Sequence, residues 1–373
     1  MNLFSEYRQV NQLLGEKQEL VFYAESRHYF QYFEKLIRDL LATQKVNICY
    51  ITSDKADPLL RETMPGMRVV FVKWMLGFLF ARLHADMMIL TMPDLDNFLF
   101  KRSKNIGTYV YVFHAAVSTH LQYRQKAFFN YDAVFCTGPY QVNEIRKAEQ
   151  LYSQHPKELI AFGYPLFDSL LQKTRLQNNS GAGKEKTILI APSWFEDCIF
   201  ETCIEELLAE LVKLPYTIIV RTHPEYEKRK KKEYARLQKL VNRYDSLFLD
   251  KETNVLDRLP QTDILVTDRS GIALEFAIGC GRPVLFIDTP LKQTNPRWRE
   301  LELEPLENSL RPRIGLSLLP GELNLLASKI RELENFSQGF RERMETVSRE
   351  SFYPLPASTG NGLRFILQKL GKG

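Results

Sequence analysis

Short apolar runs alternate with amphipathic segments along most of the chain. In the first half, six runs rich in β-branched and aromatic residues predict buried strands, at 20–26, 45–53, 67–73, 85–92, 108–115 and 132–138. Between the first two, residues 26–43 carry apolar side chains at helical spacing. Strands that are apolar throughout, separated by helices, are typical of a parallel sheet covered on both faces.

A polar segment separates this pattern from a second one like it. Asn, Ser and Gly cluster within 172–186, which predicts an exposed linker. Alternation then restarts, with strands predicted at 187–194, 216–224, 246–250, 262–267 and 282–288. Single helices are predicted over 198–213 and 225–244, and further helices near the C-terminus, the last at 359–370.

Length and pattern together predict two Rossmann-like α/β domains that face a central cleft. A chain of 373 residues is long for one core. The predicted divisions are an N-terminal domain over 1–175, a linker over 176–186 and a C-terminal domain over 187–355. Residues 356–373 are expected to form a helix that crosses back to the first domain.

Composition changes this picture little. The net charge of +5 is compatible with anionic ligands or a membrane surface, and five scattered cysteines indicate reduced thiols in a cytoplasmic protein. The most apolar stretch, 69–90, is interrupted by charges and is interpreted as strand, buried helix and strand. The alternative is that its aromatic residues dip into a membrane interface. The basic segment 227–239 contains glutamates and is interpreted as a solvated helix face, so no nucleic-acid partner is expected.

Polar side chains follow four of the predicted strands. Ligands of open parallel sheets bind beyond the carboxyl ends of the strands, so these residues are the candidates for chemistry. They are His114, Ser193, Arg221 with His223, and Asp268 with Arg269, Ser270 and Gly271.

Each candidate also has a purely structural interpretation. Ser270 and Gly271 begin a predicted helix, where free N–H groups favour an anion, but Ser270 could simply cap that helix and Asp268 could be a turn residue. Glu275, one turn later, could accept hydrogen bonds from ribose or face solvent. Arg221 could pair with a phosphate or with a carboxylate.

The two histidines carry the sharper prediction. An imidazole can take a proton from a hydroxyl or donate to a phosphate near neutral pH. His114 and His223 follow buried strands in opposite halves, whereas His120 is a weaker competitor because it falls on the helix after His114. The sequence lacks a P-loop, a G-x-G-x-x-G fingerprint, a nucleophile elbow and zinc spacing, so neither a metal nor a separate cofactor is expected.

These motifs, in this order, resemble the CDP-glycerol glycerophosphotransferases of teichoic-acid and capsule synthesis. The segments that carry the resemblance lie at 111–119, 131–140, 162–170, 188–194, 220–224, 263–271 and 281–287. The resemblance implies a GT-B fold and transfer of a polyol phosphate from a CDP-linked donor to an acceptor hydroxyl, with release of CMP. It implies that the first domain, 1–175, lies on the acceptor side and that the second, 187–355, binds the nucleotide donor. It implies His114 as general base and His223 as a donor-phosphate ligand, and it places Ser270, Gly271 and Ser193 near the donor.

The sequence also departs from the family pattern. Ala115 replaces a glycine, Arg269 replaces a tyrosine and adds a cation expected to face the cleft, and Gly271 replaces a second serine. The transferred group could therefore differ. The alternatives are a GT-B glycosyltransferase or epimerase that uses a UDP-sugar, a non-catalytic scaffold, and a lipid or nucleic-acid adaptor. The expected partners are the nucleotide donor and a polyol-phosphate or glycan acceptor, with a lipid-linked acceptor as one alternative. The expected location is the cytoplasm, with peripheral contact at the inner face of the cell membrane as one alternative.

Overall fold

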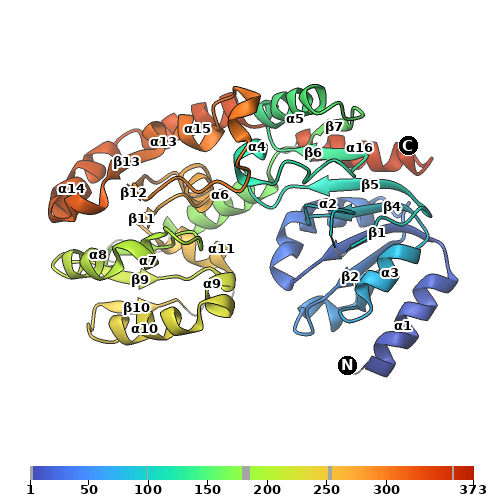
Figure 1. The fold of residues 1–373 in the computed structure, drawn as a ribbon, viewed down its shortest axis with the longest axis horizontal. Helices are drawn as coiled ribbons and strands as arrows, with labels where there is room; N and C mark the ends of the chain where they lie inside the picture. Colours follow the sequence, from blue (N-terminus) through green and yellow to red (C-terminus); the bar gives the residue numbers. More distant parts are fainter. Residues whose placement is uncertain (1–2, 99, 179–184, 251–253, 355–356) are drawn as a thin grey trace.

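Two parallel β-sheets, one in each half of the chain, form the centres of two α/β domains (Figure 1). The structure, a computed structural model, describes residues 3–98, 100–178, 185–250, 254–354 and 357–373. The first sheet has the order β3 (Met67–Phe71), β2 (Ile48–Thr52), β1 (Gln18–Ala24), β4 (Ala85–Leu90), β5 (Ile106–Val112), β6 (Ala133–Cys136) and β7 (Glu158–Ala161). The second has the order β10 (Leu247–Leu249), β9 (Thr217–Val220), β8 (Thr187–Ile190), β11 (Ile264–Thr267), β12 (Val284–Ile287) and β13 (Gly315–Leu318).

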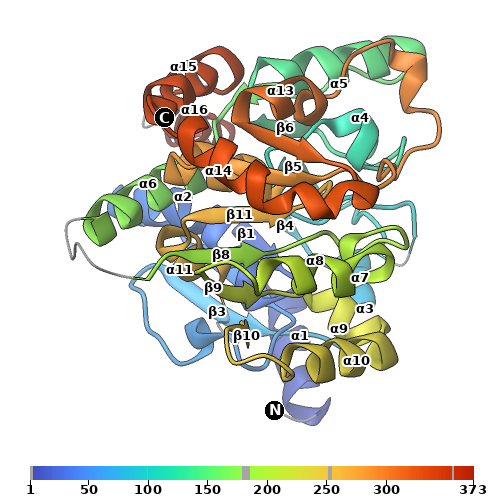
Figure 2. The ribbon, with the colours of Figure 1, turned by 90° about the vertical axis from the view of Figure 1, so that its left-hand side faces the viewer.

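The strands are buried because helices cover both faces of each sheet. In the first domain these are α1 (Leu3–Gly15), α2 (Phe30–Ala42), α3 (Leu76–Arg82), α4 (Thr119–Gln122), α5 (Pro139–Leu151) and α6 (Pro165–Asn178). In the second they are α7 (Ile199–Thr202), α8 (Ile204–Leu211), α9 (Pro224–Arg229), α10 (Lys231–Val241), α11 (Val255–Arg258), α12 (Ile272–Leu274), the π-helix η4 (Glu275–Cys280), α13 (Leu306–Ile314), α14 (Leu326–Phe336) and α15 (Phe340–Ser351). The last helix, α16 (Ala357–Lys369), returns to the first domain. In Figure 2, α8, α10 and α14 lie in front of the second sheet.

Short 3-10 helices complete the connections. They are η1 (Arg27–Tyr29), η2 (Pro58–Leu60), η3 (Leu259–Gln261), η5 (Trp298–Leu301) and η6 (Pro320–Leu325). The GT-B arrangement expected from the alternating pattern is therefore present, and 69–90 forms strand, helix and strand. Two edge strands, β7 and β13, were not predicted, because each is less uniformly buried than the central strands.

Two of the predicted helices are broken. The segment 198–213 divides into α7 and α8 at Cys203, whose φ and ψ are −147° and 20°. The break allows the N–H of Ile199, at the start of α7, to donate to Asp268, while α8 packs its leucines into the core. The segment 225–244 divides into α9 and α10 at Lys230, where φ is −112° and ψ is 55°.

The domains are joined by helices and by a shared apolar core. One buried cluster contains side chains from both sheets and from α6, α12, η4 and α15. Helix α6 crosses from the first domain and packs on η4 so closely that a Cβ at Gly279 would lie 2.7 Å from Leu170 Cβ. A side chain at Gly279 would therefore force the two helices apart.

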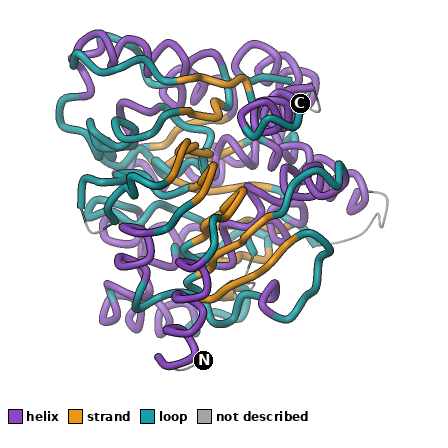
Figure 3. Tube along the Cα trace, turned by 90° about the vertical axis from the view of Figure 1, so that its right-hand side faces the viewer, coloured by secondary structure: helices purple, strands orange, loops and turns teal. Residues whose placement is uncertain are grey.

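The C-terminal helix α16 lies on the first domain, against β7 and α2. The amide of Asn361 donates to the carbonyl of Ala161 at 2.8 Å, and the rings of Phe365 and Phe135 pack edge to face at 5.8 Å. Figure 3 shows both termini on the side of the first domain. The predicted linker, 176–186, falls largely outside the described residues, and its first three residues are the end of α6.

All five cysteines are buried free thiols. Within the described ranges, no helix combines the length and apolar character that a membrane span requires.

Candidate active site

The candidate residues gather at the carboxyl ends of β5, β8, β9 and β11. Strand β8 lies between β9 and β11, so the polar residues that follow these three strands are neighbours in the second domain. His114 follows β5 in the first domain. This is the edge of an α/β sheet at which ligands bind.

His114 is held in one tautomer by the backbone of the first domain. Its Nδ1 lies 3.1 Å from the carbonyl oxygen of Thr91. A carbonyl can only accept a hydrogen bond, so Nδ1 carries the proton and Nε2 keeps its lone pair. The rings of Tyr29 and Tyr123 pack edge to face on the imidazole, at 5.6 and 6.1 Å.

The surroundings of His114 favour the neutral imidazole. Burial lowers its pKa from 6.5 to about 4, the bond to Thr91 opposes this shift, and the charge of Lys292 adds to it. His114 is therefore neutral at physiological pH and presents a proton acceptor at Nε2.

His223 is held in the opposite tautomer. It is the N-cap of α9, and its Nδ1 accepts the N–H of Glu225 at 3.1 Å. Nδ1 therefore has no proton, and Nε2–H is a donor. The ring stacks on Trp194 with centroids 5.8 Å apart. Desolvation lowers the pKa of His223, and the charge of Lys292 contributes, so this side chain offers a neutral N–H.

The two histidines lie within reach of each other's charge. The charge of a protonated His114 contributes to the lowered pKa of His223, and Lys292 acts on both rings. Coulomb interactions fade with distance, so these three groups lie near one another. A Cβ on Gly271 would lie 3.0 Å from Cγ1 of Val117, three residues after His114, so the turn after β11 contacts the His114 loop.

The turn after β11 has a backbone suited to an anion. Gly271 is the N-cap of α12, with no side-chain cap. Its φ of −62° is open to any residue, so backbone conformation does not require a glycine here. The close approach to Val117 does, because it leaves little room for a Cβ. The capping interpretation of Ser270 is not observed: its carbonyl accepts the N–H of Ala273 at 3.3 Å, and its hydroxyl bonds to none of the described residues.

Asp268 and Ser193 form a buried network behind this turn. The hydroxyl and the N–H of Ser193 donate to Asp268 Oδ1 at 2.7 and 2.9 Å, and the N–H of Arg269 donates to the same oxygen. Asp268 is completely buried and Ser193 nearly so. These contacts fix the ends of β8 and β11 relative to each other, and a ligand would have to displace them to reach the carboxylate.

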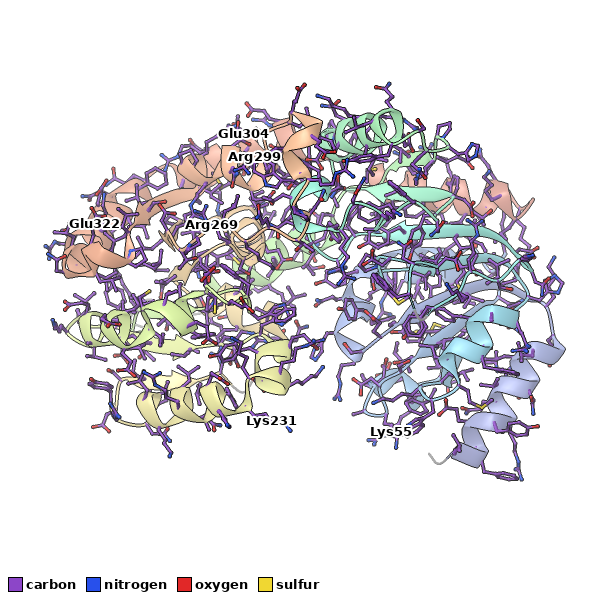
Figure 4. The ribbon with its side chains drawn as sticks, viewed as in Figure 1. Lys55, Lys231, Arg269, Arg299, Glu304 and Glu322 are labelled. Atoms are coloured by element: carbon purple, nitrogen blue, oxygen red, sulfur yellow. The ribbon has the colours of Figure 1, made fainter. Side chains whose placement is uncertain are left out.

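The arginines near the site already have protein partners. Arg269, expected to face the cleft, lies among the side chains of the second domain (Figure 4) and donates to the carbonyl of Thr289 at 3.3 Å. Arg311 binds Asp288 at 2.5 Å and the carbonyl of Asp268 at 2.9 Å. Arg221 pairs with the buried Asp250 at 2.6 Å, the carboxylate alternative of the two predicted for it.

Glu275 connects the second domain to the first. It is the first residue of η4, and Tyr164 donates its hydroxyl proton to Glu275 Oε1 at 2.6 Å, while the same hydroxyl lies 3.3 Å from the carbonyl of His114. Burial raises the pKa of Glu275 to about 7, and the bond from Tyr164 opposes the shift. Glu275 is thus buried between domains, not on the surface.

The weaker competitor, His120, lies at the domain interface. Its Nε2 donates to the carbonyl of Leu303 at 3.1 Å, and its Nδ1 lies 3.2 Å from Glu144, which raises its pKa despite burial. Both ring nitrogens therefore face acceptors of the protein itself.

Sequence reasoning missed Lys292 and Tyr164. Lys292 follows β12, whose carboxyl end borders the same site, but that strand end was not among those considered. Tyr164 lies in the 162–170 motif as a hydroxyl donor three residues after β7, a strand that was itself not predicted. Across the described ranges, no group of three or more His, Cys, Asp or Glu side chains is placed to hold a metal ion.

The model of one family, described as CDP-Glycerol:Poly(glycerophosphate) glycerophosphotransferase, matches residues 7–299. The chain belongs to this family. A curated relative, the teichoic acid glycerol-phosphate primase of Bacillus subtilis (strain 168), is 26% identical over 182 residues, which are 47% of this chain and 44% of the relative. The match thus spans less than half of that relative.

Solved structures agree on the fold. The wall teichoic acid polymerase TagF has a TM-score of 0.63 at 17% identity, with 95% of this chain and 89% of that chain covered. A structure of S. aureus MnaA with UDP has a TM-score of 0.62 at 12% identity, with 96% and 98% covered. The GT-B architecture of this family member is therefore confirmed.

Proposed function

We propose that this chain transfers a glycerol-phosphate group, or a related polyol phosphate, from a CDP-linked donor to an acceptor hydroxyl in surface-polymer synthesis. The observation that carries the proposal is the pair of opposite tautomers, a lone pair on His114 and an N–H on His223, in a member of this family. One proton acceptor and one proton donor are what an attacking hydroxyl and a diphosphate need.

The reaction requires one proton transfer and one exchange of bonds at phosphorus. The acceptor hydroxyl oxygen attacks the β-phosphorus of the donor and loses its proton to His114 Nε2. The bond between the β-phosphorus and the bridging oxygen breaks, and CMP leaves with that oxygen. His223 Nε2–H donates to a phosphate oxygen as negative charge redistributes, and the amides at Ser270 and Gly271 offer further donors.

Donor binding also improves the base. His114 with a pKa of about 4 is a weak proton acceptor while the site is empty. A diphosphate beside the imidazole favours its charged form and moves its pKa toward neutrality. General-base strength would then rise only when the donor is in place.

The residues around the histidines divide into two proposed groups. Ser270, Gly271 and Arg269 lie at the turn that would contact phosphates, whereas Asp268 and Ser193 position that turn through their mutual hydrogen bonds. Arg221 pairs with Asp250, so its proposed role is to hold the end of β9 in place and not to contact the phosphates directly. For Glu275 to bind ribose, as the sequence suggested, a ribose hydroxyl would have to replace Tyr164.

The acceptor is proposed to be a polyol phosphate or glycan on a lipid carrier, reached by peripheral contact with the inner face of the membrane. The α1–α3 surface supports this. It exposes Phe4 on α1, Phe78 on α3 and Trp74 in the turn before α3, with 63%, 41% and 57% of each side chain accessible, and the two helices are neighbours (Figure 1).

Cations flank the aromatic residues of the α1–α3 surface. Arg8 lies 4.6 Å from the Phe4 ring centroid, Lys55 lies 4.8 Å from that of Trp74, and Arg82 lies 4.1 Å from that of Phe78. Aromatic residues with flanking cations suit an anionic lipid interface. Sedimentation with phosphatidylglycerol vesicles is expected to be lost in W74S/F78S and retained in F248S, whose phenylalanine is exposed on β10. Equal sedimentation of all three proteins would contradict the membrane contact.

Nucleotide release tests the proposed activity. Purified protein with a glycerol-phosphate acceptor is expected to release CMP from CDP-glycerol, and the H114Q variant is expected to release essentially none. The MnaA likeness makes UDP-sugars the comparison donors. Release of UDP, without CMP, would replace the proposal with the UDP-sugar alternative, and binding of neither nucleotide would favour a scaffold.

A further inference from the structure

A connecting segment of the second domain, residues 288–297, carries Lys292 toward both histidines. We call this segment the strap. It leaves β12 and reaches the first domain, where the N–H of Thr294 donates to the carbonyl of Leu121 at 3.0 Å. Asn295, which is buried, donates its amide to the carbonyl of His120 at 3.0 Å and accepts the N–H of Arg297. The strap is thus fixed at the domain joint, two residues after Lys292.

The start of the strap is fixed as well. The guanidinium of Arg269 donates to the carbonyl of Thr289, and Arg311 holds Asp288. Lys292 lies between these two anchored ends. Its stem is therefore placed by backbone contacts on both sides, although the lysine itself takes no part in them.

Lys292 differs from the other cations of the site because it has no partner among the described residues. Arg221, Arg269 and Arg311 all bind carboxylates or carbonyls of the protein. Lys292 makes no ion pair and no hydrogen bond with the described part of the chain, although it is half-buried. A half-buried ammonium without a partner is costly unless a ligand supplies the anion.

The carboxylates whose charges reach Lys292 are already occupied. These are Asp268 and Glu307. Asp268 accepts from Ser193, Ile199 and Arg269, and Glu307 accepts from Ser118 and Gln122 of the first domain. Both sets of contacts hold the site together, so neither carboxylate is available to turn toward the lysine.

We propose that the Lys292 ammonium binds the diphosphate of the nucleotide donor, in the gap between His114 and His223, and is the main positive charge that the free protein holds in reserve for it. The inference rests on the proposed function and assigns the charge neutralisation to a residue outside the family motifs. Arg269, the cation expected to face the cleft, already has partners in the carbonyl of Thr289 and the carboxylate of Asp288.

Lys292 would also help to keep both histidines neutral in the free protein. Its charge lowers the pKa of His114 and of His223, although burial is the larger cause for each. When a diphosphate pairs with the ammonium, its negative charge cancels this influence, and the pKa of the base rises at the moment when a base is needed. One lysine would thereby link donor binding to base strength.

Calorimetry with cytidine, CMP and CDP tests the proposal directly. K292M is expected to weaken CDP binding roughly 10- to 100-fold, the range of a lost charged hydrogen bond. It is expected to leave cytidine binding within about 2-fold, because cytidine has no phosphate. K292R, which keeps the charge, is expected to retain most of the CDP affinity.

A matched control comes from Lys228, another lysine whose charge reaches His223 but which pairs with Glu225 at 3.0 Å. K228M is expected to change CDP affinity less than about 3-fold. Unchanged CDP affinity in K292M would overturn the inference, and so would an equal loss for cytidine and CDP, which would indicate a structural role for the strap. If the wild-type protein binds no cytidine nucleotide, the proposed function itself fails, and the variants are not needed to see it.

Discussion

Each of the two histidines follows a buried strand, one in each domain, yet their surroundings make them chemical opposites. His114 follows β5 among tyrosine rings and donates Nδ1–H to a backbone carbonyl. His223 follows β9, stacks on Trp194 and accepts a backbone N–H at Nδ1. The carbonyl of Thr91 therefore leaves a lone pair at Nε2 of His114, and the N–H of Glu225 leaves a proton at Nε2 of His223.

The difference teaches that the backbone partner, not the residue type, assigns the role. A strand end in the first domain offers a free carbonyl, whereas the start of α9 in the second offers a free N–H. A lone pair suits proton removal from the acceptor, and a proton suits donation to phosphate. The following predictions test whether this contrast governs function.

The largest effect is expected at His114. Replacing it with Ala or Gln removes the base and should lower kcat about 100- to 10,000-fold in a CMP-release assay. Glutamine fills similar space but cannot take up a proton, so it is not expected to rescue activity. Substantial activity in H114Q, with unchanged CDP binding, would remove the general-base role.

A smaller effect with a different pattern is expected at His223. H223A loses one hydrogen bond to phosphate and should lower kcat/KM roughly 10- to 100-fold. Glutamine can place an N–H near the position of Nε2, so H223Q should recover a large part of this loss. If Gln rescues position 114 and not position 223, the assignment of the two roles is reversed.

The smallest effect on turnover is expected at Glu275. Its replacement is expected to change instead how the free energy of unfolding depends on pH. Its pKa is raised to about 7 by burial, so its contribution to the free energy of unfolding is present below about pH 4.5 and is lost as pH rises through about 7. The loss amounts to about 3 kcal/mol. The lowered pKa of His114 acts in the opposite direction, since its contribution is lost as pH falls below 6.5 toward 4.

Urea unfolding of wild type and E275Q from pH 5 to 8 separates the two contributions. The difference in free energy of unfolding between the proteins is expected to change with pH, because Gln does not ionise. The free energy of unfolding of E275Q should rise with pH, because the contribution of His114 remains. Parallel curves for the two proteins would show that Glu275 titrates in the folded state as it does in the unfolded state.

Much of the fold followed from the sequence, since long apolar runs such as 85–92 leave few alternatives to a buried strand. The edge strands β7 and β13 did not, because exposed and half-buried residues interrupt their apolar pattern. The histidines could be found as strand ends. The roles of Asp268, Arg269 and Lys292 depend on which groups lie across the domain joint, and single-chain patterns do not record that.

Nuclear magnetic resonance of the histidine side chains, by long-range 1H–15N correlation at pH 7, tests the central claim most directly. With H114Q and H223Q used for assignment, His114 is predicted to carry its proton on Nδ1 and His223 on Nε2, and CDP is predicted to shift the signals of both. The same tautomer at both positions, or CDP-induced shifts in only one ring, would contradict a single site with one proton acceptor and one proton donor.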